Sequence, residues 1–391
     1  MGRALRVRDF RLLWGARTIS ALGSWLLVVA VPAHVLALTG SITATGFVLV
    51  AEYLPALVLG PIAGVLVDRW DRRSVMVAAD AFRAAAVGAL VFADDALWVV
   101  YAALLAESVG TVLFRPATQA HLPAVVGTGP ALADANALTA FTDGTVRLVA
   151  PPLGAVVLAA AGFSTLVLID VATYAVSAAL VVLTAKGVPG QRFRKVSDVV
   201  VDLVEGVKAL RRSDTARVLL RVSTLFLAAN AALSAVLVPY GVREFGDGTH
   251  VGYLVSALGA GFLVGAWLVR FADGRLGWRW QLGIAHGATA AGFVVLFAGP
   301  AFEVALGAAA LVGTAGSAAL IVPQTTLQRA VPGALLGRIG AVFVTAEAAA
   351  TLLGALAGPV VVAHRSAWTL AVATGIVILS GVVTGLVERS R

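Results

Sequence analysis

Long apolar stretches, broken by short polar segments, run along almost the whole chain. A transmembrane helix needs about 20 apolar residues to cross the bilayer, and the breaks coincide with charge clusters or with Gly and Pro. Dividing the chain at these breaks predicts twelve transmembrane helices. Their predicted limits are residues 12–38, 44–67, 74–93, 97–116, 136–161, 163–185, 217–241, 250–271, 280–299, 301–322, 339–363 and 366–387.

The longest polar stretch lies between the sixth and seventh predicted spans. Its charged residues recur at helical spacing, opposite a face of valine and leucine: Asp198, Asp202, Glu205, Lys208 and Arg212. We therefore expect an amphipathic helix on the inner membrane surface. The chain then divides into an N-terminal six-helix bundle (1–185), a cytoplasmic linker (186–216) and a C-terminal six-helix bundle (217–391).

The two halves of the chain repeat short segments. RPATQAHLP (115–123) follows the fourth span and VPQTTLQRAVP (322–332) follows the tenth, while APPLG (150–154) and AGPVV (357–361) lie in the fifth and eleventh. GPIAG (60–64) has a counterpart in GFLVG (261–265), and glycines four residues apart predict close helix packing. Two parallel repeats of six helices are typical of transporters.

The composition excludes a soluble fold. The chain is 60% hydrophobic and 13% charged, with a mean hydropathy of +0.94, whereas soluble domains carry roughly 25% charged residues. The first apolar stretch continues to about Leu38, which is longer than the core of a signal peptide. We expect it to be retained as the first transmembrane helix.

The basic residues predict the orientation. With the N-terminus inside, the outer loops hold only Arg243 and Arg365, whereas arginines and lysines crowd the inner loops and helix ends. This bias follows the positive-inside rule and places both termini in the cytoplasm. The net charge of +8 is then explained by cytoplasmic loops, and we expect no nucleic-acid partner.

Several kinds of chemistry are excluded by residue usage. The chain has no cysteine, and its five histidines share no ligand-like spacing, so we expect no disulfide, metal or cofactor. No GxxxxGKS/T segment is present, which excludes ATP drive from this chain. No Ser/His/acid set converges, so we do not expect an enzyme.

Residues 64–73 read GVLVDRWDRR, a charged turn between two apolar stretches. The turn resembles the signature loop of the major facilitator superfamily, Gly-x-Leu-x-Asp-Arg-x-Gly-Arg-Arg, with Asp71 where most members have Gly. Four further segments, FRPATQAHLP, ADANAL, LVEGVKALRR and QTTLQRAVP, are similar to the drug:proton antiporter branch that contains macrolide efflux proteins and the enterobactin exporter. The resemblance covers essentially the whole chain and implies an all-α membrane fold of two six-helix pseudo-repeats.

The resemblance also implies which residues act in gating. In the family the signature loop belongs to a cytoplasmic latch that stabilises the outward-facing state, here Gly64, Asp68, Arg69, Arg72 and Arg73. In the second half, Arg270 occupies the position matching Asp68, so an asymmetric latch is expected. Asp80 and Arg83, three residues apart, are expected to support the latch. The family's helix-bend gating would fall on Pro151, Pro152, Gly154, Gly358 and Pro359.

Charges at bilayer depth cost at least about 2.5–3.5 kcal/mol each. Seven fall well within the predicted spans: Glu52, Arg83, Glu107, Asp143, Arg147, Asp170 and Glu347. Asp143 and Arg147 are four residues apart, so we expect them to pair on one face of the fifth span. Glu107 could join them in one cluster, which we interpret as a proton and substrate site. A static ion pair that locks two helices is the alternative.

The other buried acids are isolated in the sequence. Glu347 and Glu52 are each a lone acid in the membrane, so each is a predicted proton carrier or gate residue. Asp170 is followed by Thr173 and Tyr174, which predicts a structural acid held by hydrogen bonds.

Together these features predict a monomeric secondary transporter in the inner (plasma) membrane of a bacterium. It would export amphipathic drugs or other small organic molecules by proton antiport with alternating access. Its predicted partners are a small-molecule substrate, protons and the lipid bilayer. Two alternatives stay open: a dedicated exporter of one siderophore or secondary metabolite, and a non-transporting membrane receptor or assembly factor.

Overall fold

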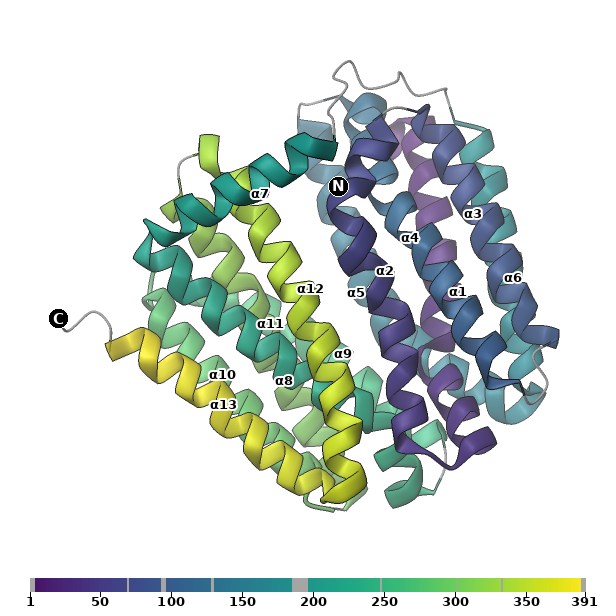
Figure 1. Cartoon of the computed structure of the whole chain (residues 1–391). Coiled ribbons are helices and arrows are strands. Elements are labelled where there is room, and N and C mark those ends of the chain that lie inside the picture. Colours follow the sequence, from purple (N-terminus) through teal and green to yellow (C-terminus); the bar gives the residue numbers. More distant parts are fainter. Residues whose placement is uncertain are drawn as a thin grey trace. The chain divides into compact units, whose positions relative to one another are not determined.

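The computed structural model describes residues 4–68, 70–92, 96–127, 130–184, 196–246, 248–299, 301–331 and 333–387 (Figure 1). Three residues of the predicted latch fall wholly or partly outside the described part: Arg69 entirely, Asp68 in its side chain, and Gly64 in its burial and contacts. All regular structure in the described ranges is helical. The helices are η1 (Ala4–Arg6), α1 (Arg8–Thr39), α2 (Ile42–Asp68), α3 (Arg72–Gly88), η2 (Ala89–Phe92), α4 (Leu97–Val126), α5 (Pro130–Ala161), α6 (Phe163–Val182), α7 (Val196–Arg211), α8 (Asp214–Phe245), α9 (Gly248–Ala272), α10 (Trp278–Leu296), α11 (Phe302–Ala330), α12 (Gly333–His364) and α13 (Ala367–Val387).

Each predicted span coincides with one α-helix, and α7 is the predicted amphipathic helix of the linker. Ten helices of the described part are long and apolar enough to cross a membrane. The count of twelve spans and the cytoplasmic side of the termini stay predictions. At the C-terminal ends, α4 and α11 continue furthest past the predicted span, to Val126 and Ala330, because RPATQAHLP and most of its counterpart stay helical despite Pro116 and Pro323.

Local signals set the helix ends. Asp71 is the N-cap of α3, and Ser213 is the N-cap of α8, where its hydroxyl accepts a hydrogen bond from the backbone N–H of Ala216. At the other end of α8, Gly246 adopts a left-handed conformation with φ of 92°, which glycine tolerates without steric cost.

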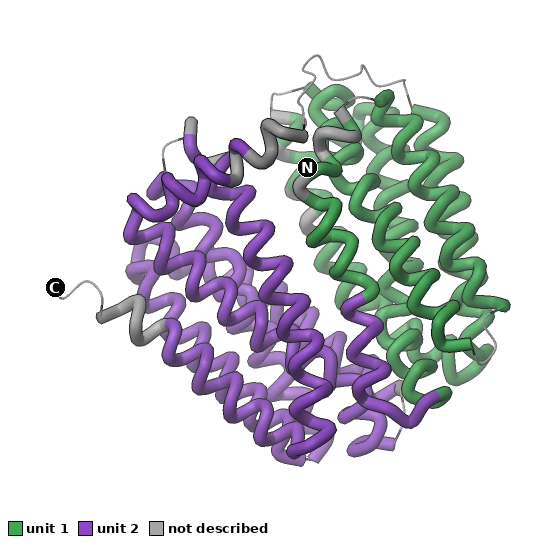
Figure 2. The backbone as a smooth tube through the Cα atoms, in the orientation of Figure 1, with its two compact units in different colours: residues 1–38, 51–199 green, residues 39–50, 200–391 purple. Residues whose placement is uncertain are grey.

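The chain forms two compact units, shown in Figure 2. Unit 1 comprises residues 1–38 and 51–199, and unit 2 comprises residues 39–50 and 200–391. Unit 1 therefore holds α1, most of α2, and α3 to α6, while unit 2 holds α8 to α13 and most of α7. The boundary differs from the predicted domains at residues 39–50, which belong to unit 2 and comprise the end of α1, the following turn and the start of α2.

Helices at matching positions of the two repeats have matching neighbours. In unit 1, α3 packs against α4 and α6, and in unit 2, α10 packs against α11 and α13. Buried apolar side chains fill each unit, among them Met76 and Phe114 in unit 1 and Leu233 and Phe293 in unit 2. The predicted all-α architecture, with a repeat between the two halves, is confirmed in the described helices.

A glycine in each unit lets two helices approach backbone to backbone. A Cβ atom at Gly154 of α5 would collide with the backbone of Leu26 in α1. In unit 2, a Cβ atom at Gly358 of α12 would collide with the backbone of Ala232 in α8. These glycines lie in APPLG and AGPVV, so the repeated segments mark the same helix contact in both halves.

The glycines of the other two repeated segments, GPIAG and GFLVG, differ in how closely they pack. Gly261 of α9 lies against the backbone of Ala310 in α11, and Gly265 lies against Thr314, as close packing requires. Gly60 of α2 has no described heavy atom within 4 Å of its Cβ position. The predicted close packing is therefore wrong at Gly60, because glycine spacing alone does not say which face of a helix meets a neighbour.

The contact at Gly154 gives a first prediction. Gly154→Ala is expected to destabilise the protein by about 1–3 kcal/mol, since the methyl group forces α1 and α5 apart. Thermal unfolding of the purified protein in detergent would show a lower Tm. Gly60→Ala is the matched control, with open space at its Cβ position, and should leave Tm unchanged. Equal shifts for both variants would contradict the proposed contact.

Candidate functional site

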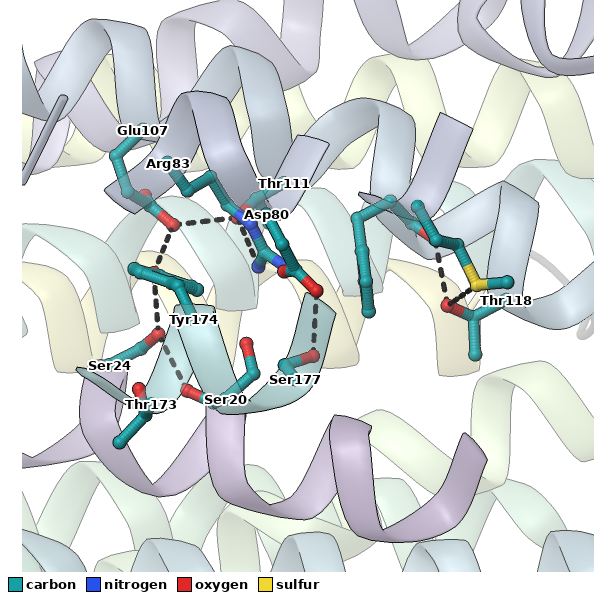
Figure 3. Close-up of polar contacts among 12 residues, drawn as sticks. Ser20, Ser24, Asp80, Arg83, Glu107, Thr111, Thr118, Thr173, Tyr174 and Ser177 are labelled. Atoms are coloured by element: carbon teal, nitrogen blue, oxygen red, sulfur yellow. Dashed lines mark hydrogen bonds and ion pairs between the residues drawn. The ribbon is translucent and has the colours of Figure 1, made fainter. Parts of the chain in front are cut away.

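A hydrogen-bonded chain of side chains in the interior of unit 1 is the leading candidate site (Figure 3). The carboxylate of Glu107 in α4 accepts hydrogen bonds from the hydroxyls of Thr111 (2.7 Å) and Tyr174 of α6 (2.9 Å). The Tyr174 hydroxyl lies 3.0 Å from the hydroxyl of Ser24 in α1. Tyr174 is fully buried. Three helices thus fix the orientation of one acid.

An ion pair lies next to these hydrogen-bonded side chains, as Figure 3 shows. Arg83 and Asp80 of α3 pair with each other, and the Ser177 hydroxyl donates to Asp80 over 2.7 Å. Both charged side chains are buried, with exposed fractions of 5% and 0%. The Arg83 guanidinium also lies 4.3 Å from the ring centroid of Phe114 and 4.5 Å from that of Tyr174, which is cation–π geometry.

Arg83 joins the ion pair to the acid. Its Nη1 atom lies 3.4 Å from the hydroxyl oxygen of Thr111, which itself donates to Glu107. A buried charge needs a partner of opposite sign and further hydrogen bonds to be tolerated. Asp80 has both. The Arg83 guanidinium is separated from Glu107 only by the Thr111 hydroxyl. The arrangement can therefore hold a carboxylate inside the bundle.

Asp170 of α6 lies at the edge of the same region. Its carboxylate accepts a hydrogen bond from Thr173 over 3.1 Å, and its side chain is buried. A Cβ atom at Gly23 of α1 would collide with the side chains of both residues, so α1 covers the acid closely. The predicted hydrogen bond between Thr173 and Asp170 is confirmed.

The predicted pairing of Asp143 is wrong. In the structure the Asp143 carboxylate of α5 pairs with Arg17 of α1 over 2.6 Å. The guanidinium of Arg147 lies 5.2 Å from the ring centroid of Trp25 instead. Asp143 meets Arg17 because α1 and α5 are in close contact at Gly154, which brings a cation from a distant part of the chain within reach.

The predicted cluster of Glu107 with Asp143 and Arg147 is also not found among the described contacts. Glu107 is held by α4 and α6, whereas Asp143 is held by α1. Glu52 of α2, in contrast, interacts with this part of α4. The Ser108 hydroxyl donates to the Glu52 backbone carbonyl, and the two carboxylates interact electrostatically.

Glu347 belongs to the other half of the chain, on α12 in unit 2. It is partly buried, and its backbone carbonyl accepts a hydrogen bond from the Thr351 hydroxyl over 2.8 Å. No hydrogen bond or ion pair of its carboxylate is present among the described residues.

Unit 1 also contains a cavity of about 270 Å³ between α1, α4 and α5. Its polar lining includes Arg17, Gln119 and Asn136, and its apolar lining includes Leu122 and Leu132. The Arg17–Asp143 pair, with both side chains 35% exposed, contributes one wall through Arg17. Such a mixed lining suits a molecule that is partly polar and partly apolar.

The predicted latch is partly described. Asp71 accepts hydrogen bonds from the backbone N–H and the hydroxyl of Ser74, at 2.9 and 2.8 Å, and so caps α3. Arg72 donates to the backbone carbonyl of Ala120 in α4 over 2.8 Å. The residue that departs from the family pattern, Asp71, thus has a structural role, and Arg72 ties the turn to α4.

The cap gives a second prediction. Burial raises the pKa of Asp71, but the hydrogen bonds from Ser74 and the charges of His121 and Arg73 outweigh it and lower the pKa below 3.8. A lowered folded-state pKa stabilises the protein above the unfolded pKa of about 3.9, and this stabilisation is lost as the pH falls through the folded value. Asp71→Ala should cost about 1 kcal/mol of unfolding free energy at pH 7.

The control for this cap is Asp71→Asn, because asparagine is also a good N-cap residue. Denaturant titrations at pH 7 should therefore place Asp71→Asn close to the wild type and Asp71→Ala below it. If the two variants lose equal stability, the cap is not the source of the effect.

The described residues offer no group of three or more His, Asp or Glu side chains that could hold a metal ion.

The hydrogen-bonding partners of the acids could not be recognised from the sequence. Ser24, Thr111 and Tyr174 are common residues in apolar helices and gave no signal, apart from the proximity of Tyr174 to Asp170. Arg17 could have been found, because it is a cation inside the first predicted span.

Known proteins that are similar to this chain are membrane transporters. The sequence model of the Major Facilitator Superfamily matches residues 13–355. Macrolide efflux protein A of Streptococcus pyogenes is 26% identical over 267 residues, which cover 66% of this chain and 65% of that protein. Multidrug efflux pump Tap of Mycolicibacterium fortuitum is 30% identical over 268 residues, which cover 65% and 64% of the two chains. The matched regions thus span slightly less than two thirds of these relatives.

A solved structure shows the same fold. The nucleoside transporter NupG superposes with a TM-score of 0.80 over 99% of this chain and 100% of its own, at 12% sequence identity. An identity this low supports the fold and says nothing about the substrate.

Proposed function

The chain belongs to the Major Facilitator Superfamily, and is therefore a multi-pass transporter of the inner membrane rather than an enzyme. We propose that it exports amphipathic organic molecules, drugs among them, in exchange for protons. The efflux proteins among its relatives support export. The Glu107 site supports proton coupling, since a proton antiporter needs a carboxylate inside the protein that can bind and release a proton.

Glu107 is the proposed proton-binding group. Its ionised form accepts hydrogen bonds from Thr111 and Tyr174, and Arg83 lies one hydroxyl group away. Protonation removes the charge that these donors stabilise, which weakens the hydrogen bonds to Glu107 and allows the contacts among α1, α4 and α6 to rearrange. That rearrangement would bias one of two states of the transporter, and Glu52 would sense it through its electrostatic coupling to Glu107.

The remaining candidate residues have proposed roles in the same cycle. Asp143, with Arg17 at the wall of the cavity, would contact substrate, and Arg147 would do so from its place beside Trp25. Glu347 would be the ionisable group of unit 2. The turn that contains Asp68 would act as the cytoplasmic latch. The segments around Pro151, Pro152 and Pro359 would act as bends, with Gly154 and Gly358 holding the adjacent helix pairs together.

The experiment that tests the proposal measures extrusion of a fluorescent drug by everted membrane vesicles, with and without a proton ionophore. Proton antiport predicts that the ionophore stops extrusion. Extrusion that survives collapse of the gradient would exclude proton coupling. Chemically diverse compounds in the same assay separate a broad exporter from one dedicated to a siderophore or another metabolite, and transport of none would favour a receptor or assembly factor.

A further inference from the structure

The linker helix α7 exposes a row of valines outside the predicted spans. Val201, Val204 and Val207 have exposed fractions of 53%, 48% and 37%, and they recur every three residues. The other side of the helix is packed, since Gly206 lies against the backbone of Arg338 and Leu210 belongs to the core of unit 2. The valines are therefore the outward face of a helix that is already attached on its inner side.

Positive charges lie beside this apolar row. Lys208, Arg211 and Arg212 are exposed at the C-terminal end of α7. Glu205, the acid of α7 whose side chain the structure describes, is paired with Arg338 of α12 over 2.8 Å, so its charge is balanced within unit 2. A row of exposed valines next to three exposed cations fits a surface that is apolar below and negatively charged at its boundary.

We propose that this face of α7 docks on anionic phospholipids of the inner leaflet. The charge of the cations selects an anionic surface, and the valines need an apolar layer directly beneath it. The inner leaflet is also within reach of α7, because α7 ends at Arg211 and α8, an apolar spanning helix, begins at Asp214. This short connection keeps α7 at the membrane surface.

Docking at α7 would also act on transport, and this part of the inference rests on the proposed export function. The Glu205–Arg338 pair and the close contact at Gly206 fix α7 to α12. α12 carries Glu347 and the Gly358 contact with α8. A lipid that holds α7 therefore favours one position of α12, and anionic lipid should change the rate of export.

The chain has no cysteine, so a single cysteine can report the environment of α7. A nitroxide on Val204→Cys, in nanodiscs of phosphatidylcholine with phosphatidylglycerol, should be accessible to oxygen and shielded from a water-soluble nickel chelate. The control is Arg275→Cys in the turn after α9, which should stay accessible to the chelate. Equal accessibility of Val204→Cys to the chelate with and without phosphatidylglycerol would overturn the proposal.

Charge removal completes the test. Each Lys or Arg near an anionic surface contributes about a fivefold gain in membrane partition, so three contribute on the order of a hundredfold. In the Lys208→Gln, Arg211→Gln, Arg212→Gln variant, phosphatidylglycerol should no longer shield the label or alter export, while export in phosphatidylcholine persists. Shielding that persists in this variant would overturn the anionic preference. An acidic protein as the true occupant would leave the label unshielded in lipid alone and shield it only when added.

The docking measurement does not depend on transport. If the label reports docking but no condition gives export, the proposed function fails and the docking surface stands. If export occurs without any response of the label to lipid charge, the reverse conclusion follows.

Discussion

Glu107→Gln is expected to abolish proton-driven export, with a loss of about a hundredfold or more in rate. Glutamine keeps the shape of the side chain, and its amide oxygen can still accept a hydrogen bond from Thr111 or Tyr174, but it cannot bind and release a proton. The measurement is uptake of substrate into proteoliposomes under an imposed pH gradient. Movement of substrate down its own gradient should persist, since this variant loses only the coupling group.

Two further variants make this result specific. Glu303→Gln removes an exposed acid from the first turn of α11 and should leave export unchanged. Tyr174→Phe removes one donor to Glu107 and is expected to slow export by roughly tenfold, the effect of losing one hydrogen bond to a charged group. Full pH-driven export by Glu107→Gln would exclude Glu107 as the proton carrier and leave Glu347 and Glu52 as candidates.

The helices and their repeat could be predicted because both depend on short stretches of sequence. A run of apolar residues predicts a spanning helix wherever it occurs, and α7 was predicted from charges at helical spacing. The shared segments APPLG and AGPVV predict equivalent helices in the two halves, and the structure places Gly154 and Gly358 in contacts between equivalent helix pairs, α1 with α5 and α8 with α12.

The partners of the acids within the helices could not be predicted in the same way. Spacing within one helix suggested Arg147 for Asp143, but the cation that pairs with it is Arg17, 126 residues away. Similarly, Glu107 bonds to Tyr174, 67 residues away. Such contacts depend on how each helix is rotated and which neighbour it meets, and an apolar pattern around most of a membrane helix leaves that rotation undetermined.

Arg83→Met is expected to destabilise unit 1 by about 3–5 kcal/mol, because it leaves the buried carboxylate of Asp80 without its cation. Methionine retains much of the volume of the arginine stem between Phe114 and Tyr174, so the loss reports charge more than packing. Denaturant unfolding in detergent, followed by tryptophan fluorescence, would measure it. Folded Arg83→Met with wild-type stability would mean that Asp80 is compensated by another group.

A matched pair in the same chain separates burial from pairing. Arg217 and Asp214 have the same spacing and order as Arg83 and Asp80, but their side chains are 52% and 89% exposed, and exposed ion pairs contribute only about 0–1 kcal/mol. Arg217→Met should therefore leave stability nearly unchanged. The double variant Asp80→Asn, Arg83→Met should recover much of the stability lost by Arg83→Met alone, because it removes the uncompensated charge while Ser177 can still hydrogen-bond to the new amide. Failure of the double variant to recover would mean that the arginine acts mainly through its contacts with the two aromatic rings.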